Sequence, residues 1–161
     1  MPKTSAGILL YRFREKKLEV FLVHPGGPFW TKKDLGAWSI PKGQFEADED
    51  PLQAARREFQ EETGQTVTGE FRELSPVIQS GGKIVQAWAA EGNCDEKNIH
   101  SNTFSIEWPP GSGKLKEFPE IDRAGWFDIL TAREKILKGQ LQLVEELVSI
   151  LNSDSNYHFV T

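Results

Sequence analysis

The sequence predicts an α+β domain built on a mixed, mainly antiparallel sheet. Segments rich in β-branched and aromatic residues outnumber those with helical periodicity, and several follow one another across short polar turns, as in hairpins. The 161 residues show no internal repeat and no linker-like stretch, and this length is typical of one domain. We therefore expect residues 1–161 to form a single domain, with a frayed tail over about 153–161.

The predicted strands are short segments bounded by glycine, proline or charged turns. They cover residues 6–13, 18–24, 67–78, 83–90, 102–108 and 125–129. The connections between them include a polar turn at 15–17, a glycine-rich loop at 25–36, a short extended piece at 37–40 and a turn-rich loop at 109–119.

The first predicted helix has a start and a stop that can be read from the sequence. Asp50 can cap it, Pro51 fits its first turn, and Gly64 follows the last periodic residue. Apolar residues at positions 52, 55 and 59 line one side. We therefore expect an amphipathic helix of about three to four turns.

Two more helical segments are predicted near the end of the chain. Thr131 and Glu134 have the spacing of a capping box for a second helix, which Gly139 interrupts. Apolar residues at helical spacing over 141–151 then indicate a last amphipathic helix.

Composition excludes several classes of function. The net charge of −5 argues against binding to nucleic-acid backbones, duplexes included, and no apolar run reaches the roughly 20 residues of a membrane span. Strand-like sequence directly after residues 1–5 leaves no room for a signal peptide. A single cysteine, Cys94, suits a reducing compartment. We expect a cytoplasmic protein, either a monomer or a homodimer.

Three carboxylates are concentrated on the first helix. Glu58, Glu61 and Glu62 have i, i+3 and i+4 spacing, which places them on one arc beside the apolar stripe. A solvated acidic face is the simpler interpretation. However, carboxylates that border the core are costly to bury, and a divalent cation would remove that cost. Mg²⁺ in particular is commonly held by a few carboxylates, waters and substrate phosphates.

These residues also carry a family resemblance. Gly43, Glu49 and the run Arg57-Glu58-Phe59-Gln60-Glu61-Glu62-Thr63-Gly64 match the fixed positions and spacing of the Nudix box. The one departure is Gln65, where the family usually has a bulky aliphatic residue that packs a loop. The resemblance implies an α/β/α sandwich and an enzyme that cleaves a diphosphate linkage in a nucleoside diphosphate joined to a group X.

The resemblance also implies roles for individual residues. Carried over by position, Glu58, Glu61 and Glu62 would ligate Mg²⁺ or Mn²⁺, with the backbone carbonyl of Gly43 as a further ligand. Arg57 would orient the carboxylates, through a pair with Glu49. These metal ligands and Arg57 form the expected catalytic centre.

The general base is less sharply defined by the resemblance. It would be a box glutamate such as Glu61, or a carboxylate from a later loop, which here is Glu117 or Glu120. We favour Glu120 because it lies nearest the start of the last predicted strand, although a solvated loop glutamate is the alternative.

The residues before the box bear on the substrate, a small nucleotide. The lead-in Trp38-Ser39-Ile40-Pro41-Lys42-Gly43 resembles dinucleoside polyphosphate hydrolases and nucleoside triphosphate pyrophosphohydrolases. Lys42 would approach a phosphate, whereas Trp38 would bind substrate or pack in the core. Phe29 and Trp30 are candidates for stacking on a base.

Other interpretations stay open at this point. The group X could belong to ADP-ribose, a sugar nucleotide, a coenzyme or a 5′-modified RNA end. A nucleotide-binding module without turnover is a further alternative. Gly111-Ser112-Gly113-Lys114 resembles part of a P-loop, but Leu115 stands where a Ser or Thr is required, so a flexible loop is the simpler interpretation.

Overall fold

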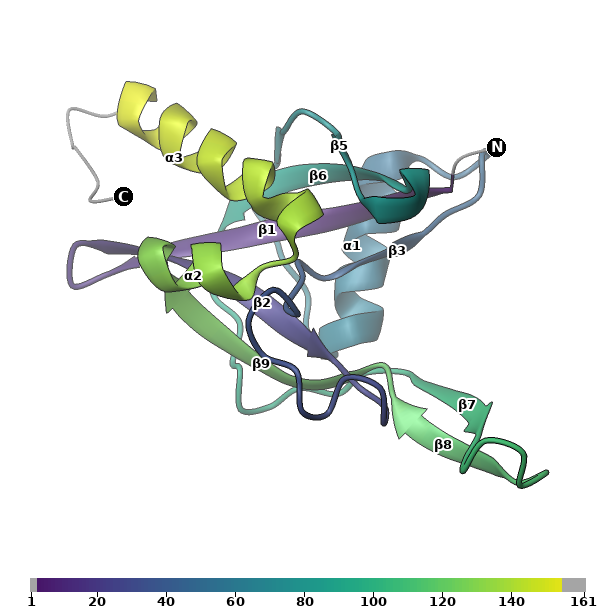
Figure 1. The fold of residues 1–161 in the computed structure, drawn as a ribbon. Coiled ribbons are helices and arrows are strands. Elements are labelled where there is room, and N and C mark those ends of the chain that lie inside the picture. Colours follow the sequence, from purple (N-terminus) through teal and green to yellow (C-terminus); the bar gives the residue numbers. More distant parts are fainter. Residues whose placement is uncertain (1–2, 155–161) are drawn as a thin grey trace.

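A central strand organises the molecule, which is described over residues 3–154 by a computed structural model (Figure 1). β1 (Thr4–Arg14) pairs in parallel with β6 (Ile84–Glu91) and antiparallel with β2 (Lys17–Pro25) and β3 (Lys42–Gln44). β1 therefore connects the two halves of the sheet.

The remaining strands extend this sheet to seven. β9 (Ile121–Asp128) pairs antiparallel with β2, and β4 (Arg72–Glu73) and β5 (Val77–Ile78) pair antiparallel with β6. A separate two-stranded sheet consists of β7 (Thr103–Glu107) and β8 (Leu115–Pro119). The predicted mixed, mainly antiparallel sheet is confirmed.

Helices cover both faces of the large sheet, as Figure 1 shows. α1 (Pro51–Thr63) packs on one face, and α2 (Ile129–Lys135) and α3 (Leu141–Asp154) pack on the other. Alternate side chains of β1 pack against the two helical layers: Ile8 and Leu10 face α1, whereas Leu9 faces α2 and α3. This is the α/β/α sandwich expected from the resemblance.

The boundaries of several elements differ from the prediction. The strand expected over 67–78 is reduced to the two short strands β4 and β5, and Pro76 between them has no N–H to offer a sheet. The expected loop at 109–119 contains β8, whose register against β7 pairs Phe104 with Phe118. Cross-strand pairing of this kind cannot be read from local composition.

The start of the second helix was also misplaced. Asp128, not Thr131, caps α2: its side chain accepts a 2.8 Å hydrogen bond from the Thr131 backbone N–H. Gly139 interrupts the helices as expected, within a short 3₁₀ turn at Lys138–Gln140. The part of the expected frayed tail beyond residue 154 lies outside the described residues. Within them, no helix is long and apolar enough to cross a bilayer.

A buried glutamine fixes the segment that leads into β3. Gln140 is fully buried, and its Oε1 accepts a 3.0 Å hydrogen bond from the Ile40 backbone N–H. Its Nε2 donates to Ser39 Oγ at 2.9 Å and to Gln79 Oε1 at 3.0 Å. The turn before α3 thus holds the chain just before Lys42 and Gly43.

Replacing Gln140 with alanine tests this attachment. Gln140→Ala leaves the buried Ile40 N–H without its acceptor, so we expect the free energy of unfolding to fall by about 1–3 kcal/mol. Urea denaturation measures this loss. Gln142→Ala, at an exposed position on α3, is the matched control and should change stability by less than about 0.5 kcal/mol. Equal losses in both variants would contradict the role of Gln140.

Candidate functional site

α1 begins and ends where the sequence predicts, and this sets which of its side chains face the sheet. The Asp50 side chain accepts a 3.1 Å hydrogen bond from the Gln53 N–H, and Gly64 adopts a φ of 76° at the helix end. The side of α1 that packs on the sheet buries Ala55, Phe59 and Thr63. The acidic residues follow this buried stripe along its edge.

Two of these carboxylates lie directly on the backbone of β3. A Cβ atom on Gly43 would overlap the carboxylate of Glu58, so any side chain at residue 43 would displace this carboxylate. Glu62 Oε1 accepts a 3.1 Å hydrogen bond from the Lys42 backbone N–H. The helix and the short strand therefore meet through carboxylates rather than through apolar side chains.

Arg57 holds the carboxylates from the outer side. Its Nε and Nη2 donate to the two oxygens of Glu49 at 2.8 and 3.0 Å, which is the predicted pair. Its Nη1 donates to Glu58 Oε1 and to Glu61 Oε2, both at 2.8 Å. The hydrogen bonds from Arg57 lower the pKa of the Glu49 carboxyl. One guanidinium thus orients three carboxylates.

The electrostatics of the site favour a cation. Burial raises the pKa of Glu62 to about 8, and burial also raises the pKa of Glu58, with a further increase from the charge of Glu61. Burial lowers the pKa of the Lys42 ammonium, whose charge interacts with both Glu62 and Glu58. The protein therefore leaves part of the negative charge of this cluster uncompensated.

The donor atoms fit Mg²⁺ or Mn²⁺ in their chemistry. Glu58, Glu61, Glu62 and the carbonyl of Gly43 offer only oxygen, which hard cations prefer. Among residues 3–154 no three acidic, histidine or cysteine side chains already converge on one point, and Arg57 binds one oxygen each of Glu58 and Glu61. The second oxygen of each of these two carboxylates is not bound by Arg57, and it is the atom that would be available to a cation.

The structure brings Glu120 to this cluster and leaves Glu117 away from it. Glu120 lies between β8 and β9, and its N–H donates to the Asn102 carbonyl at 2.8 Å, while the Asn102 N–H donates to the Glu61 carbonyl at 2.9 Å. Burial and the charge of Glu61 raise the pKa of Glu120. Glu117 is exposed on β8, where it pairs with Ser105.

The aromatic residues predicted to bind substrate fall in different environments. Trp38 is buried, with its ring 5.1 Å from that of His24 and 5.0 Å from that of Phe127, and its Nε1 donates to Asp34 at 2.8 Å. Trp38 therefore packs in the core, which is the second of the two roles expected for it.

Phe29 and Trp30 lie nearer the solvent. Phe29 is 63% exposed, and its ring lies edge-on to Trp108 at 5.6 Å. Trp30 is half-buried beneath the Lys33 ammonium, which lies 4.9 Å from the ring. The substrate contacts of both residues stay predictions.

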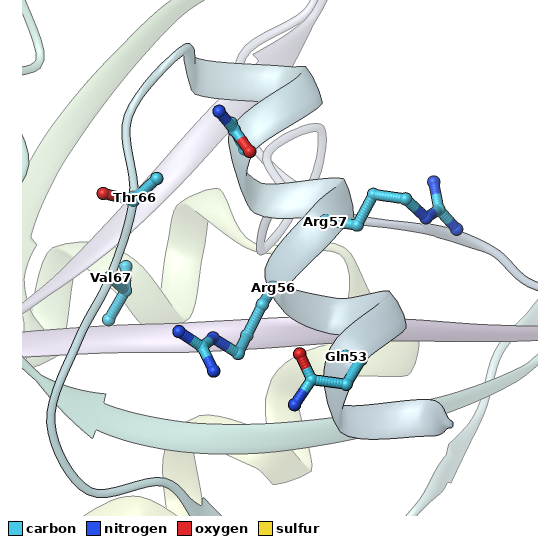
Figure 2. Close-up of a pocket in the computed structure, with 6 residues that line it drawn as sticks. Gln53, Arg56, Arg57, Thr66 and Val67 are labelled. Carbon is cyan, nitrogen blue, oxygen red and sulfur yellow. The ribbon is translucent and has the colours of Figure 1, made fainter. Parts of the chain in front are cut away.

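A hollow lies on the side of α1 that faces Thr66 and Val67. It has a volume of about 270 Å³, and Figure 2 shows α1 beside the segment with Thr66 and Val67 that closes it. No carboxylate lines this hollow, and Arg57 points away from Thr66 and Val67 toward its acidic partners. Arg56 is placed over the ring of Phe71 at 5.3 Å. Arg57 lines this hollow and also binds the carboxylate cluster, so the two adjoin, but the hollow itself offers no carboxylate to a cation.

Comparison with known proteins identifies the family. A family model described as NUDIX domain matches residues 1–147. The chain belongs to the Nudix family. An RNA pyrophosphohydrolase of Brucella anthropi is 32% identical over 129 residues, which cover 70% of this chain and 68% of that protein. An octanoyltransferase of Myxococcus xanthus is 31% identical over 101 residues, but the match covers 63% of this chain and only 25% of that protein.

Solved structures show the same fold. An Ap4A hydrolase of C. elegans in a binary complex has a TM-score of 0.66 at 22% identity, covering 94% of this Nudix chain and 98% of that one. The NUDIX domain of Shewanella oneidensis NrtR, complexed with ADP ribose, has a TM-score of 0.62 at 18% identity over 94% and 89% of the chains. At these identities the likeness concerns the fold.

Proposed function

We propose that this Nudix protein is a metal-dependent hydrolase of a diphosphate linkage, acting on a dinucleoside polyphosphate or a nucleoside triphosphate. The observation that carries the proposal is the packing of Glu58 and Glu62 on the backbone of Gly43 and Lys42. This packing places beside a backbone carbonyl two carboxylates whose ionised form the burial disfavours. A cation and the phosphates of a substrate would complete such a site.

The metal would be held by Glu58, Glu61, Glu62 and the Gly43 carbonyl. When bound, Mg²⁺ or Mn²⁺ supplies neutralisation of the diphosphate charge and lowers the pKa of a bound water. Arg57 positions Glu58 and Glu61 through Nη1, and its fork with Glu49 keeps the guanidinium in place.

The remaining steps fall to Glu120 and Lys42. Glu120 is proposed to accept the proton of the attacking water, because its pKa is raised and the charge of Glu61 acts on it. Lys42 is proposed to contact a substrate phosphate, because its ammonium lies close enough to the proposed metal ligands Glu58 and Glu62 to interact with their charges. Trp38 is too buried to offer its ring to a base, which leaves Phe29 and Trp30 as the proposed stacking residues.

The choice of substrate class rests mainly on the lead-in from Trp38 to Gly43. The structural likeness to an Ap4A hydrolase points the same way. The relative named as an RNA pyrophosphohydrolase keeps a 5′-modified RNA end as the second candidate, and ADP-ribose, a sugar nucleotide or a coenzyme are further alternatives. The net charge of −5 disfavours long RNA as a substrate. A substrate KM that does not change with salt concentration would be further evidence against long RNA.

The cell compartment and assembly state belong to the proposal as well. The free thiol Cys94 is buried and suits a reducing cytoplasm, and burial raises its pKa to about 12, which argues against a catalytic thiol. A monomer or a homodimer would serve the proposed chemistry equally.

Removing a metal ligand tests the hydrolase proposal. We expect Glu58→Gln and Glu62→Gln each to lower kcat at least about 100-fold, because each replaces a negative oxygen ligand, while the melting temperature stays nearly unchanged. The assay screens nucleotides and dinucleotides with Mg²⁺ in ¹⁸O-water and identifies the products by mass spectrometry.

Glu70→Gln, at an exposed position, is the control for this experiment and should retain full turnover. Activity retained in both ligand variants would contradict the assignment of Glu58 and Glu62. Tight nucleotide binding without phosphate or pyrophosphate release across the screen would favour a binding module instead.

A paired comparison tests the general base. Glu120→Gln should lower kcat by about 10²–10⁴-fold at saturating Mg²⁺ and at a pH where the metal site is loaded, because the amide cannot accept the proton. Glu117→Gln, three residues away on the exposed hairpin, should keep the wild-type kcat. A wild-type kcat in Glu120→Gln would contradict the assignment of the base to Glu120.

A further inference from the structure

The hairpin of β7 and β8 projects from the body of the molecule, as Figure 1 shows. Its two strands pair only with each other among the described strands, so both faces of the ribbon lie outside the large sheet. A projecting two-stranded ribbon has marginal stability unless a neighbour packs on one of its faces. The loop at 25–36 supplies such contacts.

The two faces of this hairpin differ sharply in chemistry. Side chains alternate along each strand, and the register pairs Phe104 with Phe118 and Ile106 with Lys116, so these four share one face. The opposite face carries the exposed carboxylates Glu107 and Glu117 together with exposed Ser105 and Leu115.

Aromatic residues outside the strands extend the first face. The ring of Phe104 lies against Gly27, where a Cβ would come within 2.8 Å of it, and Trp108 is in edge contact with Phe29. The Lys116 ammonium lies 5.4 Å from the ring of Phe118. We define the aromatic face as Phe29, Phe104, Ile106, Trp108, Lys116 and Phe118.

The aromatic face begins beside the carboxylate cluster. The base of the hairpin is a row of backbone hydrogen bonds, in which Gly26 N–H donates to the Glu120 carbonyl at 2.8 Å and Asn102 links Glu120 to Glu61. From Asn102, Phe104 lies about 7 Å and Trp108 about 20 Å along the strand, at 3.3 Å per residue. The face therefore leads outward from the proposed reaction centre.

We infer that the aromatic face binds the second nucleoside of a dinucleoside polyphosphate whose diphosphate lies at the carboxylates of α1. This inference rests on the proposed function and deepens it. The half-buried and exposed rings offer a stacking surface to any type of base, and Lys116 offers a positive charge to the polyphosphate. Glu107 and Glu117 lie on the opposite face of the hairpin, so neither of these carboxylates repels a polyphosphate bound at the aromatic face.

On this inference the first base binds elsewhere, and a mononucleotide lacks the second base that the aromatic face would take. A nucleoside triphosphate held by its phosphates has one base, whereas a dinucleoside polyphosphate has a second base that needs a separate surface. Phe29 is 63% exposed, and its ring contacts that of Trp108. Burying a phenylalanine side chain is normally favourable, so the exposed part of this ring is available to a ligand. An exposed aromatic edge of this kind fits a base that stacks on it.

The test compares two substrates in three variants. The readout is the ratio of kcat/KM for diadenosine tetraphosphate to kcat/KM for ATP, both with Mg²⁺. Phe29→Ala and Lys116→Ala should each lower this ratio, by about tenfold for Phe29→Ala, since one stacking contact to a base is lost. Leu115→Ala, with a side chain 78% exposed on the opposite face of the same hairpin, should keep the wild-type ratio.

The outcomes separate this inference from the proposed function. An unchanged ratio in Phe29→Ala and Lys116→Ala, with melting temperatures equal to wild type, would overturn the inference while the hydrolase activity stands. An equal loss for both substrates, or a change from dimer to monomer in Phe29→Ala, would also overturn it. If wild type hydrolyses neither substrate, the proposed function fails. The same ratio is then taken from dissociation constants measured by calorimetry, with the same result expected.

Discussion

The contact between the carboxylates of α1 and the backbone of β3 is the constraint on which the site depends. Glu58 lies where a side chain on residue 43 would be, and Glu62 accepts the N–H of Lys42. Burying carboxylates is costly without compensation, and Arg57 compensates only those that point outward. The Lys42 ammonium offsets part of the charge of Glu58 and Glu62, and a divalent cation would offset the rest.

Much of the surrounding structure serves to hold β3 at this contact. The N–H of Ile8 donates to the Pro41 carbonyl at 3.2 Å, and Val23 and Ser39 exchange two backbone hydrogen bonds of 2.8 and 2.9 Å. Gln140 binds the same segment from the other layer of the sandwich. On the opposite side, the row through Asn102 and Glu120 ties α1 to the hairpin. The proposed reaction centre is thus fixed from both faces of the sheet.

The sequence predicted correctly those features that depend on residues close together in the chain. The cap at Asp50, the stop at Gly64 and the spacing of Glu58, Glu61 and Glu62 all depend on residues within one helix. The pairing of β8 with β7 and the arrival of Glu120 beside Glu61 depend on residues far apart in the chain, so composition alone could not reveal them. Asp128 illustrates an intermediate case, because a cap one turn earlier outcompeted a valid capping box.

Calorimetric titration of wild type and Glu62→Gln with Mn²⁺, at pH 6 and pH 8.5, shows whether the carboxylates of α1 bind a metal ion. Because burial raises the pKa of Glu62 to about 8, metal binding at pH 6 must displace a proton. We expect tighter Mn²⁺ binding by wild type at pH 8.5 than at pH 6, with proton release at the lower pH. We also expect binding at least about tenfold weaker, with a smaller pH dependence, in Glu62→Gln. Equal Mn²⁺ affinity in the two proteins at both pH values would contradict the claim that these carboxylates form a metal site.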